Sequence, residues 1–265
     1  MTEARPFVAL PDLVADLRAL GVGEGQTLMV HSSLRCMGHV LGGAPTVVRA
    51  LLAALGDRGT LVMPAFSPKV SDPAGWSKPA LPAGWIERAR AHVPAYDADT
   101  TPTSMGAIPE TFRRWPGAQR GPHPQVSLCA RGPLAAEIVA PHALAWGEGA
   151  GSPFERLAEM DAGLLLLGVG FNRAALLHYA ESLVPHGRRK TRRIPIGDGA
   201  ERSWVEAPDV GDDLDTHFPP LGAAYLAEGR ARRGKVGEAD AVLASARDLT
   251  AFASQYLARA LEQPA

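Results

Sequence analysis

Residues Leu164 to Glu181 read LLLLGVGFNRAALLHYAE, and this stretch predicts a buried strand, a glycine turn and a helix in succession. Four consecutive leucines are too few to span a membrane, but they suit a strand that is covered on both faces and needs no polar alternation. Gly168 and Gly170 break the strand, and good helix formers follow from Ala174 to Tyr179. The helix then lies over the carboxyl end of the strand, where open α/β sheets bind ligands.

Two side chains of this helix can carry acid–base chemistry. His178 and Glu181 are spaced i, i+3 and therefore share one helix face. An imidazole, with an unperturbed pKa of about 6.5, can accept a proton from an amine or hydroxyl, and a carboxylate can support it. The alternative is a structural helix that covers the sheet and holds a core histidine. This stretch alone does not decide between the two interpretations.

The bulk properties indicate a globular α/β chain with no strong electrostatic partner. At 265 residues it forms one large α/β domain or two small ones, and 46% hydrophobic residues allow a sizeable core. The sequence shows no clear domain linker, and we expect a single domain over residues 1–265. The net charge of −1 argues against nucleic acid or a membrane surface as partner. The first residues, MTEARPFVAL, do not resemble a signal peptide. Cys36 and Cys129 form no CxxC pair and suit a reducing compartment, so we expect a cytoplasmic protein.

The sequence of the first 64 residues predicts a βαβ unit with parallel strands. Its strands are Thr27 to His31 and Thr60 to Met63, and its helix runs from Pro45 to Leu55. A loop-rich insert, residues 64–102, follows, and inserts of this length are usually functional. The other expected elements are helices at 11–20, 85–92, 104–112 (capped by Ser104), 134–139, 153–160 (capped by Ser152), 174–179 and 239–261, and a strand at 126–130.

Several common sites are not indicated. The eight histidines show no metal-ligand spacing, so we expect no metal. No serine lies in a GxSxG turn. Gly168-Val169-Gly170 begins a dinucleotide-binding motif, but Arg173 stands where its third glycine belongs. Residues Arg18 to Gly23 (RALGVG) match a pyrophosphate signature, but they close a helix rather than open one, and so indicate a helix end.

The segment His31-Ser32-Ser33-Leu34-Arg35 is better placed, since it follows a buried strand and precedes a glycine-rich loop. Its hydroxyls, amides and arginine could bind phosphate or pantetheine, or they could form a polar turn. Residues 206–215 contain five acids and 188–193 five basic residues. Solvated faces, a polycation site and a phosphate site are the alternatives there.

Taken together, these motifs resemble the aminoglycoside 3-N-acetyltransferase family of antibiotic N-acetyltransferases. The resemblance covers nearly the whole chain in order, in the stretches LGVGEGQTLMVHSSLRCMGHVLGGAPTVVRALLAALGDRGTLVMP, YDADTTPTSMG, HPQVSLCARGP, GEGAGSPFERL, LLLLGVGFNRAALLHYAESL, WVEAPDV and GRARRGKVGEADAVLASARDLTAFASQYL. It implies a three-layer α/β fold, with a mostly parallel central sheet and helices on both faces. It also implies that acetyl-CoA is the co-substrate and an aminoglycoside amine the acceptor.

The resemblance also assigns roles to individual residues. His178 and Glu181 match the family's LHxAE motif and are the expected catalytic residues. Cofactor contacts are expected from His31, Ser32, Ser33, Leu34, Arg35, Thr101, Thr103, Met105 and Gly106, and substrate contacts from Asp97, Glu206 and Asp209. The chain departs from the family in two places. Ala175 stands where a threonine is frequent, and residues 187–190 (GRRK) replace an asparagine-lysine-arginine run.

We expect His178 to act as general base in direct acetyl transfer, with no acyl-enzyme. Glu181, Glu206 or Asp209 could orient its ring, and amides near Ser33 or Gly106 could bind the oxyanion. A homodimer is compatible with the sequence. Two other functions remain open: an acetyltransferase for a non-antibiotic amine, and a CoA-binding protein or thioester hydrolase without amine transfer.

Overall fold

A seven-stranded sheet forms the middle layer of the structure, a computed structural model that describes residues 7–77, 79–185, 187–198 and 201–262. The spatial order of its strands is β3-β4-β2-β1-β5-β9-β8. In chain order the strands are β1 (Thr27–Ser32), β2 (Thr60–Pro64), β3 (Gln119–Arg120), β4 (Leu128–Arg131), β5 (Gly163–Leu167), β8 (Arg232–Val236) and β9 (Ala239–Ser245).

Parallel pairing is confined to the three central strands. β1 pairs in parallel with β2 and with β5, as the βαβ pattern predicts. The outer strands β3, β4, β9 and β8 pair antiparallel, whereas we predicted a mostly parallel sheet. Antiparallel neighbours need only a short connection. β8 and β9 are joined by the two residues Gly237 and Glu238, and Gly237 adopts a left-handed φ of 58°.

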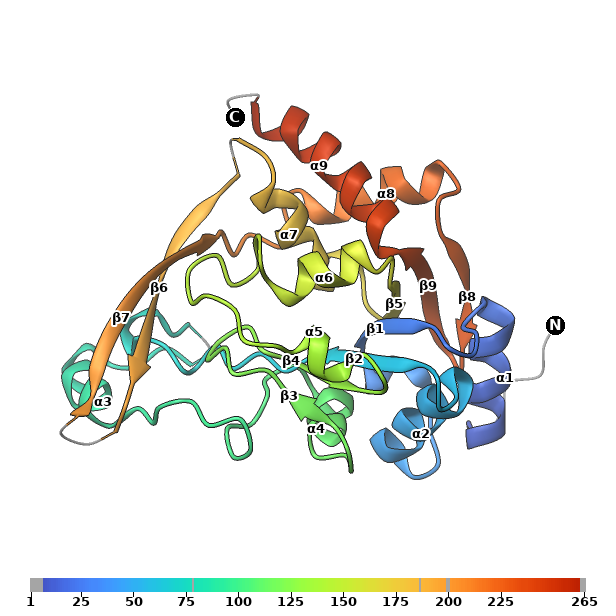
Figure 1. Ribbon diagram of the computed structural model, residues 1–265, viewed down its shortest axis with the longest axis horizontal. Coiled ribbons are helices and arrows are strands. Elements are labelled where there is room, and N and C mark those ends of the chain that lie inside the picture. Colours follow the sequence, from blue (N-terminus) through green and yellow to red (C-terminus); the bar gives the residue numbers. More distant parts are fainter. Residues whose placement is uncertain (1–6, 78, 186, 199–200, 263–265) are drawn as a thin grey trace.

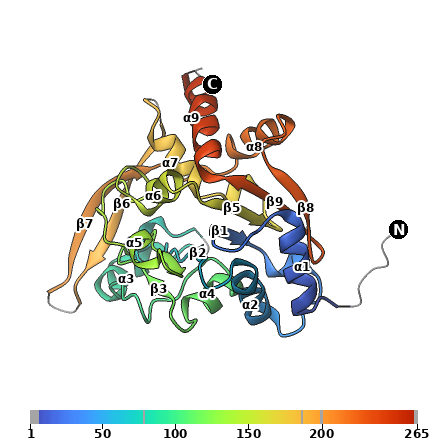
Figure 2. The same cartoon turned by 45° about the vertical axis from the view of Figure 1, so that its right-hand side comes forward.

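Helices cover both faces of the sheet, which confirms the three-layer α/β fold (Figures 1 and 2). One layer contains α1 (Leu10–Leu20), α2 (Gly43–Leu55) and α4 (Ala107–Arg113). The other contains α5 (Ala135–Ile138), α6 (Pro153–Glu159), α7 (Leu176–Ser182) and α9 (Ala246–Glu262), with α8 (Phe218–Ala227) against α9.

The four leucines of β5 divide between the two cores. Leu165 and Leu167 pack with α1 and α2, and Leu164 and Leu166 pack with α6, α7 and α9. All four are at most 1% exposed. The prediction of a strand buried on both faces is therefore confirmed, and the helix that follows is α7, after one 3-10 turn at Phe171–Arg173.

Two local predictions differ from the structure, and one paired element was not predicted. Residues 239–245 form strand β9 rather than the start of the last helix, because they pair with β5 on one side and β8 on the other. The cap of α4 is Gly106, not Ser104. The element that was not predicted is a hairpin of β6 (Arg189–Ile196) and β7 (Ser203–Val210), whose strands pair antiparallel.

The β6–β7 hairpin extends away from the central sheet and lies beside the insert that carries α3 (Ile86–His92) (Figure 1). Backbone and side-chain bonds join the two segments. The Asp72 N–H donates to the Arg193 carbonyl at 3.1 Å, the Arg193 guanidinium pairs with the Asp72 carboxylate at 2.5 Å, and Arg202 donates to the Val93 carbonyl. These bonds therefore hold the insert and the hairpin together on one side of the molecule.

Candidate active site

The carboxyl ends of β1 and β5 mark the point where the chain changes faces of the sheet. The chain leaves β1 toward α2 on one face, and it leaves β5 toward α7 on the other. Adjacent parallel strands with this connectivity leave a crevice at their carboxyl ends, which is the usual ligand site of open α/β sheets. The two ends are held together, since the Ser33 N–H donates to the Leu167 carbonyl at 2.9 Å.

The segment after β1 brings unpartnered polar groups to this end of the sheet. His31 is 6% exposed, and its Nε2 has no hydrogen-bond partner in the structure; the same holds for Ser32 Oγ. Burial lowers the pKa of His31 to about 3, so its ring is neutral at physiological pH. His31 is in register with Leu166 and therefore points to the face covered by α7. Leu34 begins a 3-10 turn, and Arg35 is exposed.

The second expected cofactor segment lies at the end of the neighbouring strand β2. Thr103 Oγ1 and the Ser104 N–H both donate to the Phe66 carbonyl, at 3.1 and 2.9 Å. The Met105 N–H donates to Thr103 Oγ1 at 3.3 Å, and Gly106 caps α4 with a φ of 99°. Thr101 lies in a turn before this segment, where its Oγ1 accepts the Asp97 N–H at 2.9 Å. The structure thus brings the two expected cofactor segments to adjacent strand ends.

His178 lies on α7, which the glycine turn after β5 directs over the sheet. The side chain is 5% exposed, and its ring packs edge-to-face on Phe218 with centroids 5.0 Å apart. Its Nδ1 has no hydrogen-bond partner in the structure. Within the described residues, no hydrogen bond joins His178 to Glu181, Glu206 or Asp209, so the carboxylate expected to orient the ring is not seen.

Glu181 is fully buried and bonds instead to Arg188. Its Oε1 accepts from Arg188 Nε at 2.7 Å and from the Arg188 N–H at 3.0 Å, and its Oε2 accepts from Arg188 Nη2 at 2.9 Å. Arg188 also pairs with Asp213 at 2.7 Å. Glu181 and His178 share α7, but Glu181 supports the chain that follows the helix.

The three expected substrate acids occupy different environments. Asp209 has no exposed surface, and it forms an ion pair with Arg192. The Glu206 side chain is 68% exposed, and its Oε1 lies 3.7 Å from Arg193 Nε. Asp97 is exposed, and its carboxylate accepts from Thr100 within its own turn, which lowers the pKa of Asp97. The structure does not gather them into one cluster.

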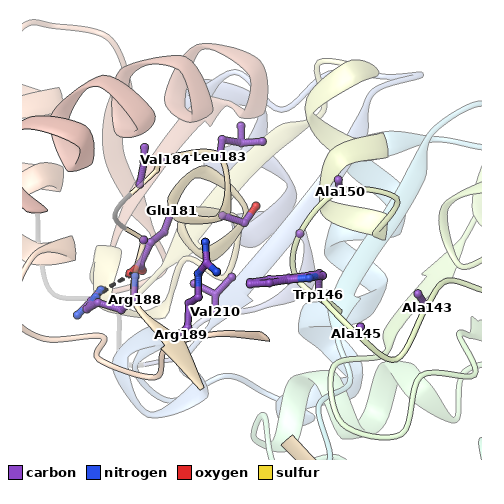
Figure 3. A pocket seen from close by; sticks show the side chains of 13 residues that line it. Ala143, Ala145, Trp146, Ala150, Glu181, Leu183, Val184, Arg188, Arg189 and Val210 are labelled. Atoms are coloured by element: carbon purple, nitrogen blue, oxygen red, sulfur yellow. Dashed lines mark hydrogen bonds and ion pairs between the residues drawn. The ribbon is translucent and has the colours of Figure 1, made fainter. Parts of the chain in front are cut away.

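Beside Glu181 lies a pocket of about 430 Å³ (Figure 3). One wall is the end of α7 with Arg188 and Arg189, and the opposite wall is a segment that we call the Trp146 loop, residues 143–150. Arg189 lies over the Trp146 ring, 5.3 Å from its centroid. Val210, at the end of β7, closes the side between them (Figure 3).

Nothing in the sequence marks the Trp146 loop as a pocket wall. The position of the Trp146 side chain depends on a left-handed φ of 55° that the sequence does not show. Within the ranges that the structure describes, no group of His, Cys, Asp and Glu could hold a metal ion. No helix there is long and apolar enough to cross a membrane.

Comparison with known proteins places this chain in a family. The family described as aminoglycoside 3-N-acetyltransferase matches residues 29–258. The chain is 37% identical to an aminoglycoside N(3')-acetyltransferase-like protein, YokD, of Bacillus subtilis over 246 residues, 92% of this chain and 90% of that protein. It is also 37% identical to an aminoglycoside N(3)-acetyltransferase III of Pseudomonas aeruginosa over 251 residues, 92% of both chains.

Solved structures agree with the sequence comparison. The YokD crystal structure covers 97% of this chain and 95% of its own at 35% identity, with a TM-score of 0.91. A binary complex of AAC-IIIb with CoASH covers 98% and 99% at 31% identity, with a TM-score of 0.83. AAC-VIa bound to sisomicin covers 96% and 98% at 32% identity, with a TM-score of 0.82. The chain therefore belongs to the aminoglycoside 3-N-acetyltransferase family, whose members are transferases.

Proposed function

We propose that the protein transfers the acetyl group of acetyl-CoA to the 3-amino group of an aminoglycoside, with His178 as general base. The observation that carries the proposal is the unpartnered Nδ1 of His178, which is buried on the helix that follows β5. Two relatives support the substrates, since one was solved with CoASH and another with sisomicin.

His178 supplies the proton acceptor that the reaction needs. An aminoglycoside amine is mostly protonated at neutral pH and cannot attack a carbonyl until a proton leaves. One proton of the ammonium passes to solvent, which leaves the free amine. His178 takes a second proton from the nitrogen as it bonds to the thioester carbon. The C–S bond then breaks, the amide forms, and the proton passes to the thiolate of CoA. A general base of this kind typically contributes 10²–10⁴-fold to the rate.

The orientation of His178 comes from packing rather than from a carboxylate. Phe218 lies edge-to-face against the imidazole, and the surrounding helix residues are buried. Glu181 acts on the site indirectly, because its bonds to Arg188 join the end of α7 to the start of β6. This arrangement accounts for a glutamate on the same helix face that does not touch the histidine.

The developing oxyanion requires hydrogen-bond donors. The Ser33 N–H is already bonded to the Leu167 carbonyl, so it is not available. We propose the Ser32 hydroxyl, which has no partner in the structure, and the Gly106 N–H at the start of α4 as donors. Ala175 brings no hydroxyl to the site, so the donors have to come from the strand ends.

Release of free thiol from acetyl-CoA, measured with and without amines, tests this function. Thiol release that depends on an aminoglycoside, with a 3-N-acetyl product identified by NMR, is the expected result. Release that depends only on simple amines would make the protein an acetyltransferase for another class of substrate. Release without any amine would indicate a thioester hydrolase, and CoA binding without release a binding protein.

A further inference from the structure

Arg192, on β6, joins three segments that are far apart in the sequence. Its guanidinium donates to Asp209 on β7, to Glu148 Oε2 in the Trp146 loop at 2.6 Å, and to Gln125 Oε1 ahead of β4 at 3.0 Å. The Gln125 amide in turn donates to the Val70 carbonyl of the insert at 2.7 Å. The Arg192 side chain is only 10% exposed. A planar guanidinium presents five N–H donors in a fixed fork, so it can hold acceptors on three separate segments in one fixed geometry.

The Trp146 loop depends on these bonds for its position. The Trp146 N–H donates to the Pro208 carbonyl of β7 at 2.7 Å, and the Glu148 N–H donates to Asp209 Oδ1 at 3.5 Å. The Glu148 carboxylate accepts from Arg192 on β6, so the loop is attached to both strands of the hairpin. The left-handed φ of Trp146 is unfavourable for a bulky residue and persists only where neighbouring contacts hold it. The conformation that places the Trp146 ring against the pocket is therefore imposed by the hairpin.

We propose that Arg192 is a positioning residue for the acceptor amine, which it controls by fixing the distance between the Trp146 loop and α7. The proposal rests on the proposed function, and it takes the pocket beside Glu181 as part of the acceptor site. Arg192 does not line this pocket. It acts through Glu148, whose loop forms one wall, and through Asp209, whose Oδ1 accepts the N–H of the pocket residue Val210 at 2.8 Å.

The need for a positive charge does not by itself explain why residue 192 is an arginine. Glu148 is 3% exposed and Asp209 is fully buried, so both carboxylates need a cation nearby. A lysine would supply that charge, but its single ammonium group could not keep the three separate contacts of the guanidinium fork. Arg192→Lys thus separates neutralisation from positioning.

Steady-state kinetics of Arg192→Lys test the proposal. We expect the KM for the aminoglycoside to rise about tenfold or more, while kcat and the KM for acetyl-CoA stay within about threefold, since substrate positioning and not the base is changed. Arg193→Lys is the matched control: Arg193 is the next residue of β6 and pairs with the insert residue Asp72, not with the Trp146 loop. We expect it to leave the KM for the aminoglycoside within about threefold.

Amide hydrogen exchange provides a readout that does not need activity. In Arg192→Lys, the amides of residues 143–150 should exchange at least about tenfold faster, and those of α7 at the wild-type rate. Glu148→Gln, which keeps the shape of the side chain, should give the same pattern if Arg192→Lys does not fold. An unchanged exchange rate in the loop, or an equal rise across the whole chain, would overturn the positioning role. Failure of the wild-type protein to acetylate any aminoglycoside would overturn the proposed function. The exchange rates would then test only whether Arg192 holds the Trp146 loop in place.

Discussion

Glu181 and Arg188 form a two-pronged ion pair, with Nε–Oε1 and Nη2–Oε2 distances of 2.7 and 2.9 Å, between the end of α7 and the start of the β6–β7 hairpin (Figure 3). The partners are not equivalent. Glu181 has no exposed surface, whereas Arg188 is 22% exposed along its side chain and keeps a second ion pair with Asp213. Removing Arg188 therefore leaves a fully buried carboxylate without this cation, whereas removing the Glu181 charge leaves a partly exposed guanidinium that still pairs with Asp213.

We expect Arg188→Met to cost more stability than Glu181→Gln. Arg188→Met leaves a buried carboxylate without its cation, which typically costs about 3–5 kcal/mol. Glu181→Gln leaves a neutral amide beside an arginine that still pairs with Asp213, so about 1–2 kcal/mol is expected. Urea unfolding at pH 7 measures both. Arg189→Met is the control, because Arg189 is exposed and contacts the Trp146 ring; the reverse order of losses would contradict the asymmetry.

His178→Ala should abolish most of the turnover and leave acetyl-CoA binding intact. Loss of a general base lowers kcat by about 10²–10⁴-fold, because the base acts only in the chemical step. Stopped-time product assays give kcat, and calorimetry gives the Kd for acetyl-CoA. His92→Ala, in the exposed part of the insert, is the control. Turnover within about threefold of the parent would remove His178 from the mechanism.

Much of this site follows from local sequence, because local patterns fix its elements. Four leucines and two glycines predict β5 and the turn to α7, and the i, i+3 spacing places His178 and Glu181 on one face. The segment 31–35 was placed correctly at a strand end for the same reason. These features depend on neighbours within a few residues.

The partners of these residues could not be predicted, because tertiary contacts decide them. Asp209 looked like part of an acidic loop, but Arg192 lies 17 residues away and Glu148 61 residues away, on another loop. The segment 239–245 has helix formers and nevertheless becomes β9, since pairing with β5 and β8 outweighs its local preference.

Arg35→Ala should weaken acetyl-CoA binding more than it slows the chemical step. An exposed arginine that bonds a phosphate or amide oxygen contributes about 1.5 kcal/mol, or roughly tenfold in Kd. Titration calorimetry with CoA measures the loss. Arg18→Ala serves as control, since Arg18 is an exposed residue of α1 in the RALGVG segment that ends the helix. If neither Arg35→Ala nor a Ser32/Ser33 double alanine variant changes the affinity for CoA, the loop does not bind the cofactor.

Salt should distinguish the two acids of β7. Exposed charges are screened over about 8–10 Å at ordinary ionic strength, whereas buried ones are screened much less. Glu206→Gln, at an exposed position, should therefore flatten the rise of the aminoglycoside KM with salt. Asp209→Asn should keep the wild-type salt dependence and instead lower stability by about 1–2 kcal/mol, because it weakens the bond to Arg192. The aminoglycoside KM of each variant, measured from low to high salt with a monoamine as reference, shows which of the two acids contributes to the salt dependence.

His31 should make the fold less stable as the pH falls. Burial lowers the pKa of His31 to about 3, while an unfolded chain has a histidine pKa of about 6.5. Between these values the unfolded state binds the extra proton, so stability is full above pH 6.5 and is lost as the pH decreases toward 3. From pH 7 to pH 5 the contribution of His31 is about 2 kcal/mol. Urea unfolding of His31→Gln should therefore show a loss between these two pH values that is smaller than the wild-type loss by about this amount. His92→Gln, at an exposed position, should behave like the wild type. An unchanged loss in His31→Gln would mean that His31 carries its proton in the folded protein, and that it does not enter the crevice as a neutral ring.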